Sequence, residues 1–213
     1  MKKKMIGVFL LSLALIGMGY VAFVAIRSAS IDAQIRREIQ NTSYARVGDI
    51  GSTRKLVILP LFEEAASRED LSAMHGVSYL IRTDQATILF DTGFDTGILQ
   101  HNMQRLGISL KDIDGFVISH DHPDHVGGYT WWPSHTFSLT NTQPDLGGIP
   151  VYVPEAMNYP GVKPILVAQP QKIAAGVYSM GTIPYREVAS MSKYQLTRTE
   201  QALAVNVEGM GSS

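Results

Sequence analysis

Three histidines and two aspartates lie within six consecutive positions of this sequence. They are His120, Asp121, His122, Asp124 and His125, and they include half of the six histidines in the chain. Imidazole and carboxylate groups are the ligands that zinc and iron take from a protein without thiolates. The chain has no cysteine, so disulfides, thiolate-bound metals and thiol nucleophiles are excluded. The cluster predicts a metal site, and the alternative is a solvated polar loop.

The spacing within the cluster restricts its backbone. On a helix, His120 and His122 would point about 200° apart, because a helix has 3.6 residues per turn. On an extended segment the same two side chains point the same way. Pro123 then bends the chain, so that Asp124 and His125 can approach from another direction. Two glycines that follow the cluster let the backbone pass closely.

Short apolar runs predict the strands that position this cluster. Residues 116–118 have the profile of a buried strand, and they lead directly into the histidines. Residues 77–82 and 87–90 are strand-like runs, and the turn residues 83–85 between them predict a hairpin.

One helix and two further strands are expected around this hairpin. The helix begins at a cap on Thr96 and ends at Gly107. The folded domain begins with a strand at 56–59, which Pro60 halts, and a last strand is expected at 203–207.

Composition limits the class of protein. The 213 residues include 18 Lys and Arg against 19 Asp and Glu, a formal net charge of -1, so no nucleic-acid partner is expected. Hydrophobic residues make up 45% of the chain, which excludes an acidic disordered protein and allows one sizeable core.

The N-terminal region predicts a membrane segment. Three lysines precede an uncharged run at 5–26, which would span about 33 Å as a helix and so cross a bilayer core of about 30 Å. This length favours an uncleaved anchor over a signal peptide. We expect an anchor or signal segment at 1–29, a polar juxtamembrane stalk with a short helix at 30–54, and a folded domain at 55–213. The lysines are expected inside and the domain on the extracytoplasmic side.

The pattern His120-x-His122-x-Asp124-His125 after a buried strand resembles the signature of the metallo-β-lactamase fold superfamily. Flanking motifs resemble the subgroup that includes the dihydropterin-linked ribofuranosylaminobenzene phosphate synthases. These motifs are His75-Gly76-Val77-Ser78, the strand that ends in Asp91-Thr92-Gly93, and Glu200-Gln201-Ala202-Leu203. The resemblance implies an α/β fold, an αββα sandwich of two sheets with helices outside, here preceded by a transmembrane helix.

The resemblance also implies roles for individual residues. His120 and His122 would bind a first metal, and Asp124 and His125 a second. Asp124 would orient the attacking water, while Asp91 would support the histidine loop without binding metal. The implied cofactor is zinc, as two divalent ions, with iron or manganese as alternatives. The implied function is a membrane-tethered, metal-dependent hydrolase that acts on a small-molecule substrate through a metal-activated water.

The sequence departs from this family in its last part. The family supplies a third histidine, a bridging aspartate and a last histidine, but no histidine follows His135 here. We therefore expect an incomplete second half and impaired catalysis. His135 could substitute as a ligand, although an exposed loop histidine is the favoured interpretation.

Two other functions are alternatives, and several further residues have expected roles. The chain could be a tethered module that binds metal or a ligand without turnover. Asp91-Thr92-Gly93 also resembles an aspartic-protease turn, but Phe94 stands where that family has Ser or Thr. His75 is expected to be a polar residue near the hairpin and His101 a solvated helix residue. Trp131 and Trp132 either line a substrate mouth or pack against the domain.

Overall fold

The computed structural model describes residues 2–210 with the exception of 50, 67 and 187–196. The chain forms two compact units. One contains residues 1–43 and 184–198, and the other contains residues 44–183 and 199–213. The second unit carries the histidine cluster.

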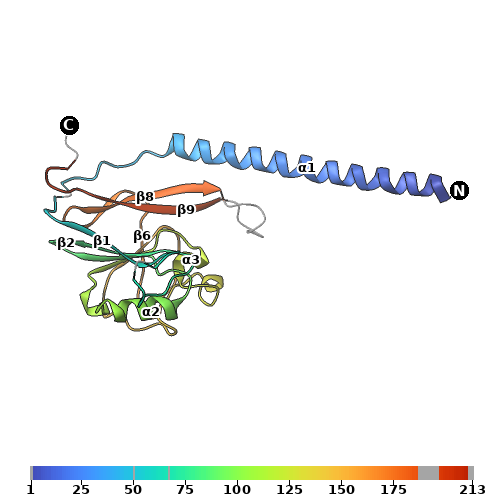
Figure 1. Cartoon of the computed structure of the whole chain (residues 1–213). Coiled ribbons are helices and arrows are strands. Elements are labelled where there is room, and N and C mark those ends of the chain that lie inside the picture. The colour runs from blue at the N-terminus through green and yellow to red at the C-terminus, as the bar shows by residue number, and fades with distance from the viewer. Residues whose placement is uncertain (1, 50, 67, 187–196, 211–213) are drawn as a thin grey trace. The chain divides into compact units, whose positions relative to one another are not determined.

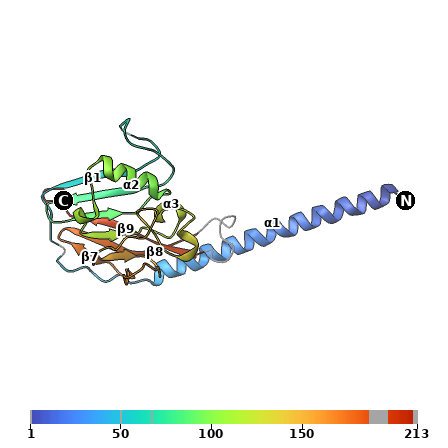
Figure 2. The same ribbon diagram turned by 90° about the horizontal axis from the view of Figure 1, so that it is seen from below.

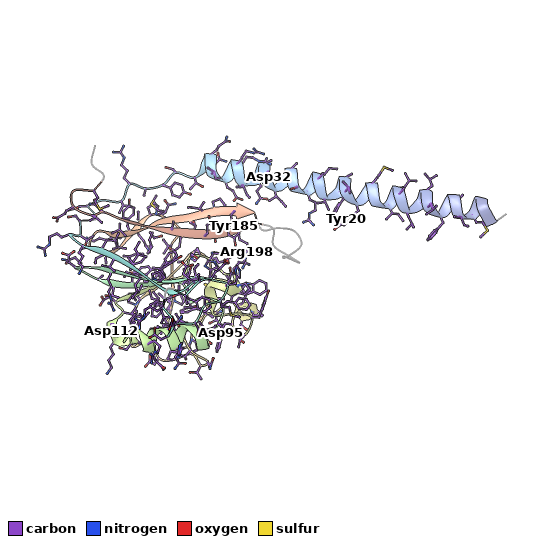
Figure 3. The ribbon with its side chains drawn as sticks, viewed as in Figure 1. Tyr20, Asp32, Asp95, Asp112, Tyr185 and Arg198 are labelled. Carbon is purple, nitrogen blue, oxygen red and sulfur yellow. The ribbon has the colours of Figure 1, made fainter. Side chains whose placement is uncertain are left out.

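The first unit contains one long helix, α1 (Lys2–Asn41). Its 40 residues correspond to about 60 Å. The short helix predicted within 30–54 is not separate, because no glycine or proline follows Gly19 before residue 42 to interrupt the helix. The apolar side chains are exposed along the helix, including Tyr20 at 69% (Figure 3). By length and composition α1 can cross a membrane, a property that signal sequences share.

The second unit contains two β-sheets, except for the strand ends at 184–186 and 197–198, which belong to the first unit. In the six-stranded sheet, β1–β2–β3 pair antiparallel and β3–β4–β5–β6 pair parallel. The second sheet has the order β7–β8–β9. The strands of the first sheet are β1 (Leu56–Phe62), β2 (Ser78–Thr83), β3 (Thr87–Phe90), β4 (Gly115–Val117), β5 (Val151–Val153) and β6 (Ile165–Leu166). Those of the second are β7 (Gln171–Ala174), β8 (Val177–Arg186) and β9 (Thr197–Val205).

The helices of this unit are short. They are α2 (Thr96–Arg105), α3 (Pro123–Val126) and the 3₁₀ turns η1 (Leu110–Asp112) and η2 (Trp132–Ser134). Helix α2 covers one face of the six-stranded sheet, and the three-stranded sheet lies on the other face (Figures 1 and 2). The predicted mixed α/β fold with two sheets is therefore confirmed. In the described part of this unit the layers are helix, sheet and sheet.

Each face of the six-stranded sheet has its own core. On the helix side, Leu99 and Met103 of α2 pack in a cluster with Leu80, Leu89 and Phe116 from three strands. On the other face, side chains from β2, β3 and β4 pack against the second sheet. The residues of this cluster include Ile81, Ile88, Val117, Val177 and, partly buried, Leu203. The alternation of strand side chains places neighbours in opposite cores.

The predicted hairpin is confirmed, because β2 and β3 pair antiparallel from Tyr79 opposite Phe90 to Arg82 opposite Thr87. The expected stop at Pro60 is wrong. Strand β1 continues through Pro60 with a register shift before Phe62. Proline is tolerated there because β1 lies at the edge of the described sheet.

Two predicted boundaries also move. Helix α2 begins at Thr96, but its cap is Asp95, whose carboxylate accepts a hydrogen bond from the Ile98 amide at 2.9 Å. Aspartate is among the best residues at this position. Strand β9 begins at Thr197 and ends at Val205, so it starts earlier and stops two residues sooner than expected.

Gln201 of β9 joins the two sheets close to the histidine cluster. Its amide nitrogen donates to the Ile118 carbonyl at 2.8 Å and the Tyr152 carbonyl at 3.1 Å. Its side-chain oxygen accepts a hydrogen bond from Ser179 Oγ at 2.7 Å. The Gln201 backbone N–H also donates to the Ser119 carbonyl at 2.8 Å. The side chain is 3% exposed, so these bonds are shielded from water.

Replacing Gln201 with Ala should destabilise the second unit by about 3 kcal/mol, because buried groups in both sheets would lose their partners. The measurement is urea unfolding of the full chain in detergent, followed by the fluorescence of its two tryptophans. Gln104→Ala on the exposed side of α2 is the matched control, with an expected change within about 0.5 kcal/mol. Equal midpoints for the two variants would contradict this role of Gln201.

Candidate metal centre

The histidine loop follows β4 as an extended segment and then turns into a helix. His122 has extended angles, φ -121° and ψ 152°, and caps α3, which starts at Pro123. Proline suits the first position of a helix because its missing N–H has no helical partner there. The helix ends at Gly127, which has φ 94°. A side chain at Gly127 would approach the Ser138 carbonyl to 2.9 Å, so the predicted close passage of the backbone is observed.

Three imidazoles of the loop converge. His120 Nε2 lies 3.1 Å from His122 Nδ1, and the two ring centroids are 4.6 Å apart. The His120 and His125 rings are 3.9 Å apart. The extended backbone brings the first two side chains together, and α3 returns the third one to them.

Asp91 holds this loop from the end of β3. The residue is 1% exposed and has φ 60°, a left-handed conformation that is rare for residues with a side chain. One carboxylate oxygen accepts the Ser119 backbone N–H at 2.6 Å. The other lies 2.6 Å from Ser119 Oγ and 2.7 Å from His125 Nδ1. Asp91 is thus placed where a support for the loop would act.

Asp91 also controls the proton of His125. Burial lowers the pKa of His125, but the hydrogen bond and charge of Asp91, with the charges of Asp124 and Glu200, more than offset it, so the net pKa is raised. Since Nδ1 faces the carboxylate, Nδ1 carries the proton and Nε2 is left for another partner.

Asp124 lies between two histidines. Its Oδ2 is 3.5 Å from His125 Nε2 and 3.3 Å from His75 Nε2. His75 Nδ1 in turn lies 2.9 Å from Glu64 Oε1. The hydrogen bond with Glu64, together with the charges of Asp124 and Glu64, raises the pKa of His75 despite a partial opposing effect of burial. His75 was expected to be only a polar hairpin residue, and the structure places it at the site.

His135 does not join the imidazole cluster. Its Nδ1 is 2.5 Å from Oδ2 of Asp121, which is fully buried. Trp132 Nε1 donates to the Asp121 carbonyl at 2.8 Å, and the Trp132 ring packs partly buried against the core. His135 is therefore a half-exposed partner of a buried carboxylate, and it was expected to be an exposed loop histidine. Asp121 and Trp132 tie η2 to the histidine loop. His101 is exposed on α2, as expected, and contacts the Asp70 carbonyl.

The chemistry of the donors suits a divalent ion, because three imidazoles and a carboxylate converge in one partly buried loop. In the structure, however, these side chains contact one another and leave no space for an ion between them. Among the residues that the structure describes, no group of three or more such side chains is arranged around a metal position. The imidazoles contact one another, so a bound ion would have to replace these contacts.

Comparison with known proteins identifies this region. Residues 71–138 match the family model of the metallo-beta-lactamase superfamily. These residues are therefore similar to the metallo-β-lactamase superfamily. The segment contains the histidine loop, Asp91 and His75, so the resemblance inferred from the loop motif is confirmed.

One curated relative matches part of the chain. It is the 7,8-dihydropterin-6-methyl-4-(beta-D-ribofuranosyl)-aminobenzene-5'-phosphate synthase of Methanocaldococcus jannaschii, which is 35% identical over 85 residues. The match covers 38% of this chain and 29% of the relative, so the chain spans less than a third of that protein. The resemblance to this subgroup is likewise confirmed.

Solved structures also align with part of the chain. A metal-dependent hydrolase of the beta-lactamase superfamily is 21% identical with a TM-score of 0.44, covering 71% of this chain and 61% of its own. A quorum-quenching N-acyl homoserine lactone lactonase is 16% identical with a TM-score of 0.41, covering 74% of this chain and 70% of its own.

The pKa of His125 predicts a pH dependence of stability. A raised folded pKa means that the native state binds the proton more tightly, so this stabilisation is full below about pH 6.5 and is lost as pH rises through the folded pKa. The free energy of unfolding of the metal-depleted chain should therefore fall as the pH rises above about 6.5. Asp91→Asn should lower it by about 2 kcal/mol at pH 6 and flatten the slope, because asparagine tolerates the left-handed backbone but loses the charge.

Urea unfolding of the EDTA-treated full chain in detergent, followed by tryptophan fluorescence, measures this slope. Asp95→Asn is the matched control, since asparagine caps a helix as well as aspartate. A wild-type slope that persists in Asp91→Asn would show that His125 does not depend on Asp91.

Proposed function

We propose that this chain is a membrane-tethered, metal-dependent hydrolase of the metallo-β-lactamase superfamily that acts on a small-molecule substrate. The observation that carries the proposal is the convergence of three imidazoles on one loop, with Asp91 fixing the proton of His125. A solvated polar loop would not need a buried carboxylate behind it. The buried Asp91 gives the loop a fixed orientation. It does so at the free-energy cost of a buried charge and a left-handed backbone, which a purely structural turn does not require.

In this proposal His120 and His122 hold one divalent ion, and Asp124 and His125 hold another. Zinc fits this donor set best, and iron or manganese are alternatives. When bound, such an ion lowers the pKa of a coordinated water and polarises a carbonyl or phosphoryl oxygen. Asp124 is the residue that we propose to orient the attacking water, through a hydrogen bond to its carboxylate.

Two residues behind the loop contact the proposed ligands His125 and His120. Asp91 Oδ2 holds the proton of His125 on Nδ1, which leaves Nε2 as a donor. Ser119 Oγ also lies 3.0 Å from His120 Nδ1, so the same hydroxyl contacts both Asp91 and a proposed ligand. Because the imidazoles contact one another, we propose that metal binding is weaker than at a site whose donors already surround one point.

We propose the same organisation along the chain as the sequence predicts. Residues 1–29 form a membrane anchor or signal segment, 30–54 a juxtamembrane stalk and 55–213 the catalytic domain. The apolar part of α1 and the lysines before it support an anchor with the domain on the extracytoplasmic side.

A tethered module that binds metal or a ligand without turnover is the second candidate. The mutual contacts of the imidazoles favour it, because a closed cluster has no position ready for a substrate. The aspartic-protease interpretation has no such support. Both carboxylate oxygens of Asp91 are occupied by Ser119 and His125, so they are not available to share a proton with a second carboxylate.

Replacing His120 and His122 with Ala should reduce the zinc affinity of the full chain at least tenfold. Removal of two ligands should cost more affinity than removal of a hydrogen-bond partner behind a ligand, which typically costs at least tenfold. A competition titration with a chromophoric chelator measures the affinity. His101→Ala, which removes an exposed histidine of α2, is the matched control. Equal zinc content in the double variant and the wild type would remove the ligand assignment.

Hydrolysis separates the two candidate functions. The zinc-loaded chain should hydrolyse a generic phosphodiester or ester, although at an impaired rate because no histidine follows His135 to complete the ligand set, and the double variant should lose this activity. Metal binding that depends on His120 and His122 without any turnover would favour the binding module.

The full chain should remain with the membrane fraction after expression, because the apolar run at 5–26 is long enough to span a bilayer. Fractionation followed by N-terminal sequencing tests this. A soluble product whose N-terminus lies near Ser30 would show a cleaved signal segment instead.

A further inference from the structure

We propose that His75, oriented by Glu64, is a further metal-binding residue on the Asp124 and His125 side of the centre. This inference rests on the proposed function and extends its ligand set to a residue outside the histidine loop. His75 lies between β1 and β2, 45 or more residues before that loop.

The first argument is the matched surroundings of two imidazoles. His125 Nδ1 lies 2.7 Å from the Asp91 carboxylate, and its Nε2 is 3.5 Å from Asp124 Oδ2. His75 Nδ1 lies 2.9 Å from the Glu64 carboxylate, and its Nε2 is 3.3 Å from the same oxygen. An imidazole with one nitrogen on a carboxylate and the other directed to the centre is the arrangement of metal-binding histidines.

The second argument is electrostatic. When Nδ1 donates its proton to a carboxylate, the neutral ring presents a lone pair at Nε2. Two such lone pairs and a carboxylate oxygen would repel one another, so a proton or a metal cation must lie among them. The separations of 3.3 and 3.5 Å put both imidazoles beside the same carboxylate oxygen, and a modest reorientation is still needed, since these described side chains do not yet surround a metal position.

The third argument is that the backbone of His75 is held against Asp124. The N–H of Val77 donates to the Asp124 carbonyl at 3.3 Å. Gly76 has φ 119°, and a side chain there would approach the same carbonyl to 2.7 Å. Glycine is therefore needed for this close contact, and it fixes His75 beside the histidine loop.

Further hydrogen bonds hold the segment between β1 and β2 on the N-terminal side of His75. The carboxamide of Asn102 on α2 donates to the Leu61 and Ser72 carbonyls at 2.8 Å and accepts the Ser72 N–H at 2.9 Å. The Met74 N–H donates to the Glu63 carbonyl at 3.1 Å. The His75 side chain itself is 69% exposed, so it can reorient towards an ion while its backbone stays in place.

The test measures zinc affinity of the metal-depleted full chain in detergent by competition with a chromophoric chelator. Glu64→Gln should weaken binding about 10- to 100-fold, the usual effect of removing the carboxylate behind a ligating histidine. His75→Ala should weaken it at least as much and should change the visible absorption of the Co²⁺-loaded chain. Glu69→Gln in the same loop and His101→Ala on α2 are the matched controls and should bind as the wild type does.

The outcomes distinguish this inference from the proposed function. If the wild type binds no zinc, both are overturned. If His120→Ala/His122→Ala weakens binding but His75→Ala and Glu64→Gln bind as the wild type does, only the role of His75 is overturned. Glu64→Gln leaves the imidazole of His75 intact and replaces the carboxylate with an uncharged amide of the same size. Its result therefore does not depend on whether His75→Ala folds normally.

Discussion

The carboxylate of Asp91 connects the two segments on which the candidate metal centre depends. It accepts the Ser119 N–H where the chain leaves β4, and it holds His125 after the helical turn of α3. The adjoining turn is bound to the same place, because the Thr92 N–H donates to the His125 carbonyl at 2.9 Å. A buried charge needs such partners, since an unpaired carboxylate in the interior is strongly unfavourable. The left-handed backbone of Asp91 is maintained by these contacts, so the strand end, the loop and the imidazoles form one interdependent unit.

Much of the fold follows from local patterns in the sequence. The hairpin from Ser78 to Phe90 and the buried strand before Ser119 were predictable, because alternating apolar runs and turn residues act over a few positions. Local patterns could not show that β1 is an edge strand, in which proline is tolerated. They therefore predicted that the strand ends at Pro60. They also could not distinguish Asp95 from Thr96 as the helix cap, since both residue types serve in that position. The second sheet depends on long-range contacts such as those of Gln201, which no local period indicates.

The site was predictable only where its residues are neighbours in the sequence. His120, His122, Asp124 and His125 occupy one short motif, and Asp91 follows an apolar strand in a recognisable turn. The proposed role of His75 depends on the contact between Gly76 and the Asp124 backbone, which joins segments far apart in the chain. The only local signal was a glycine directly after a histidine. His135 illustrates the same limit, because its partner Asp121 lies 14 positions earlier and is completely buried.

The irregular end of β1 has a consequence for self-association. Val57 and Ile58 are 40% and 56% exposed on this outer strand, and an exposed apolar strand is a template on which another chain can add. Pro60 lacks an N–H, and the register shifts between Pro60 and Phe62, so the regular pairing with β2 covers only 56–60. These five residues lie at the short end of the about five to six of an ordinary strand. Pro60 thus acts as a gatekeeper residue: it shortens the regular part of the exposed edge strand and so opposes edge-to-edge aggregation.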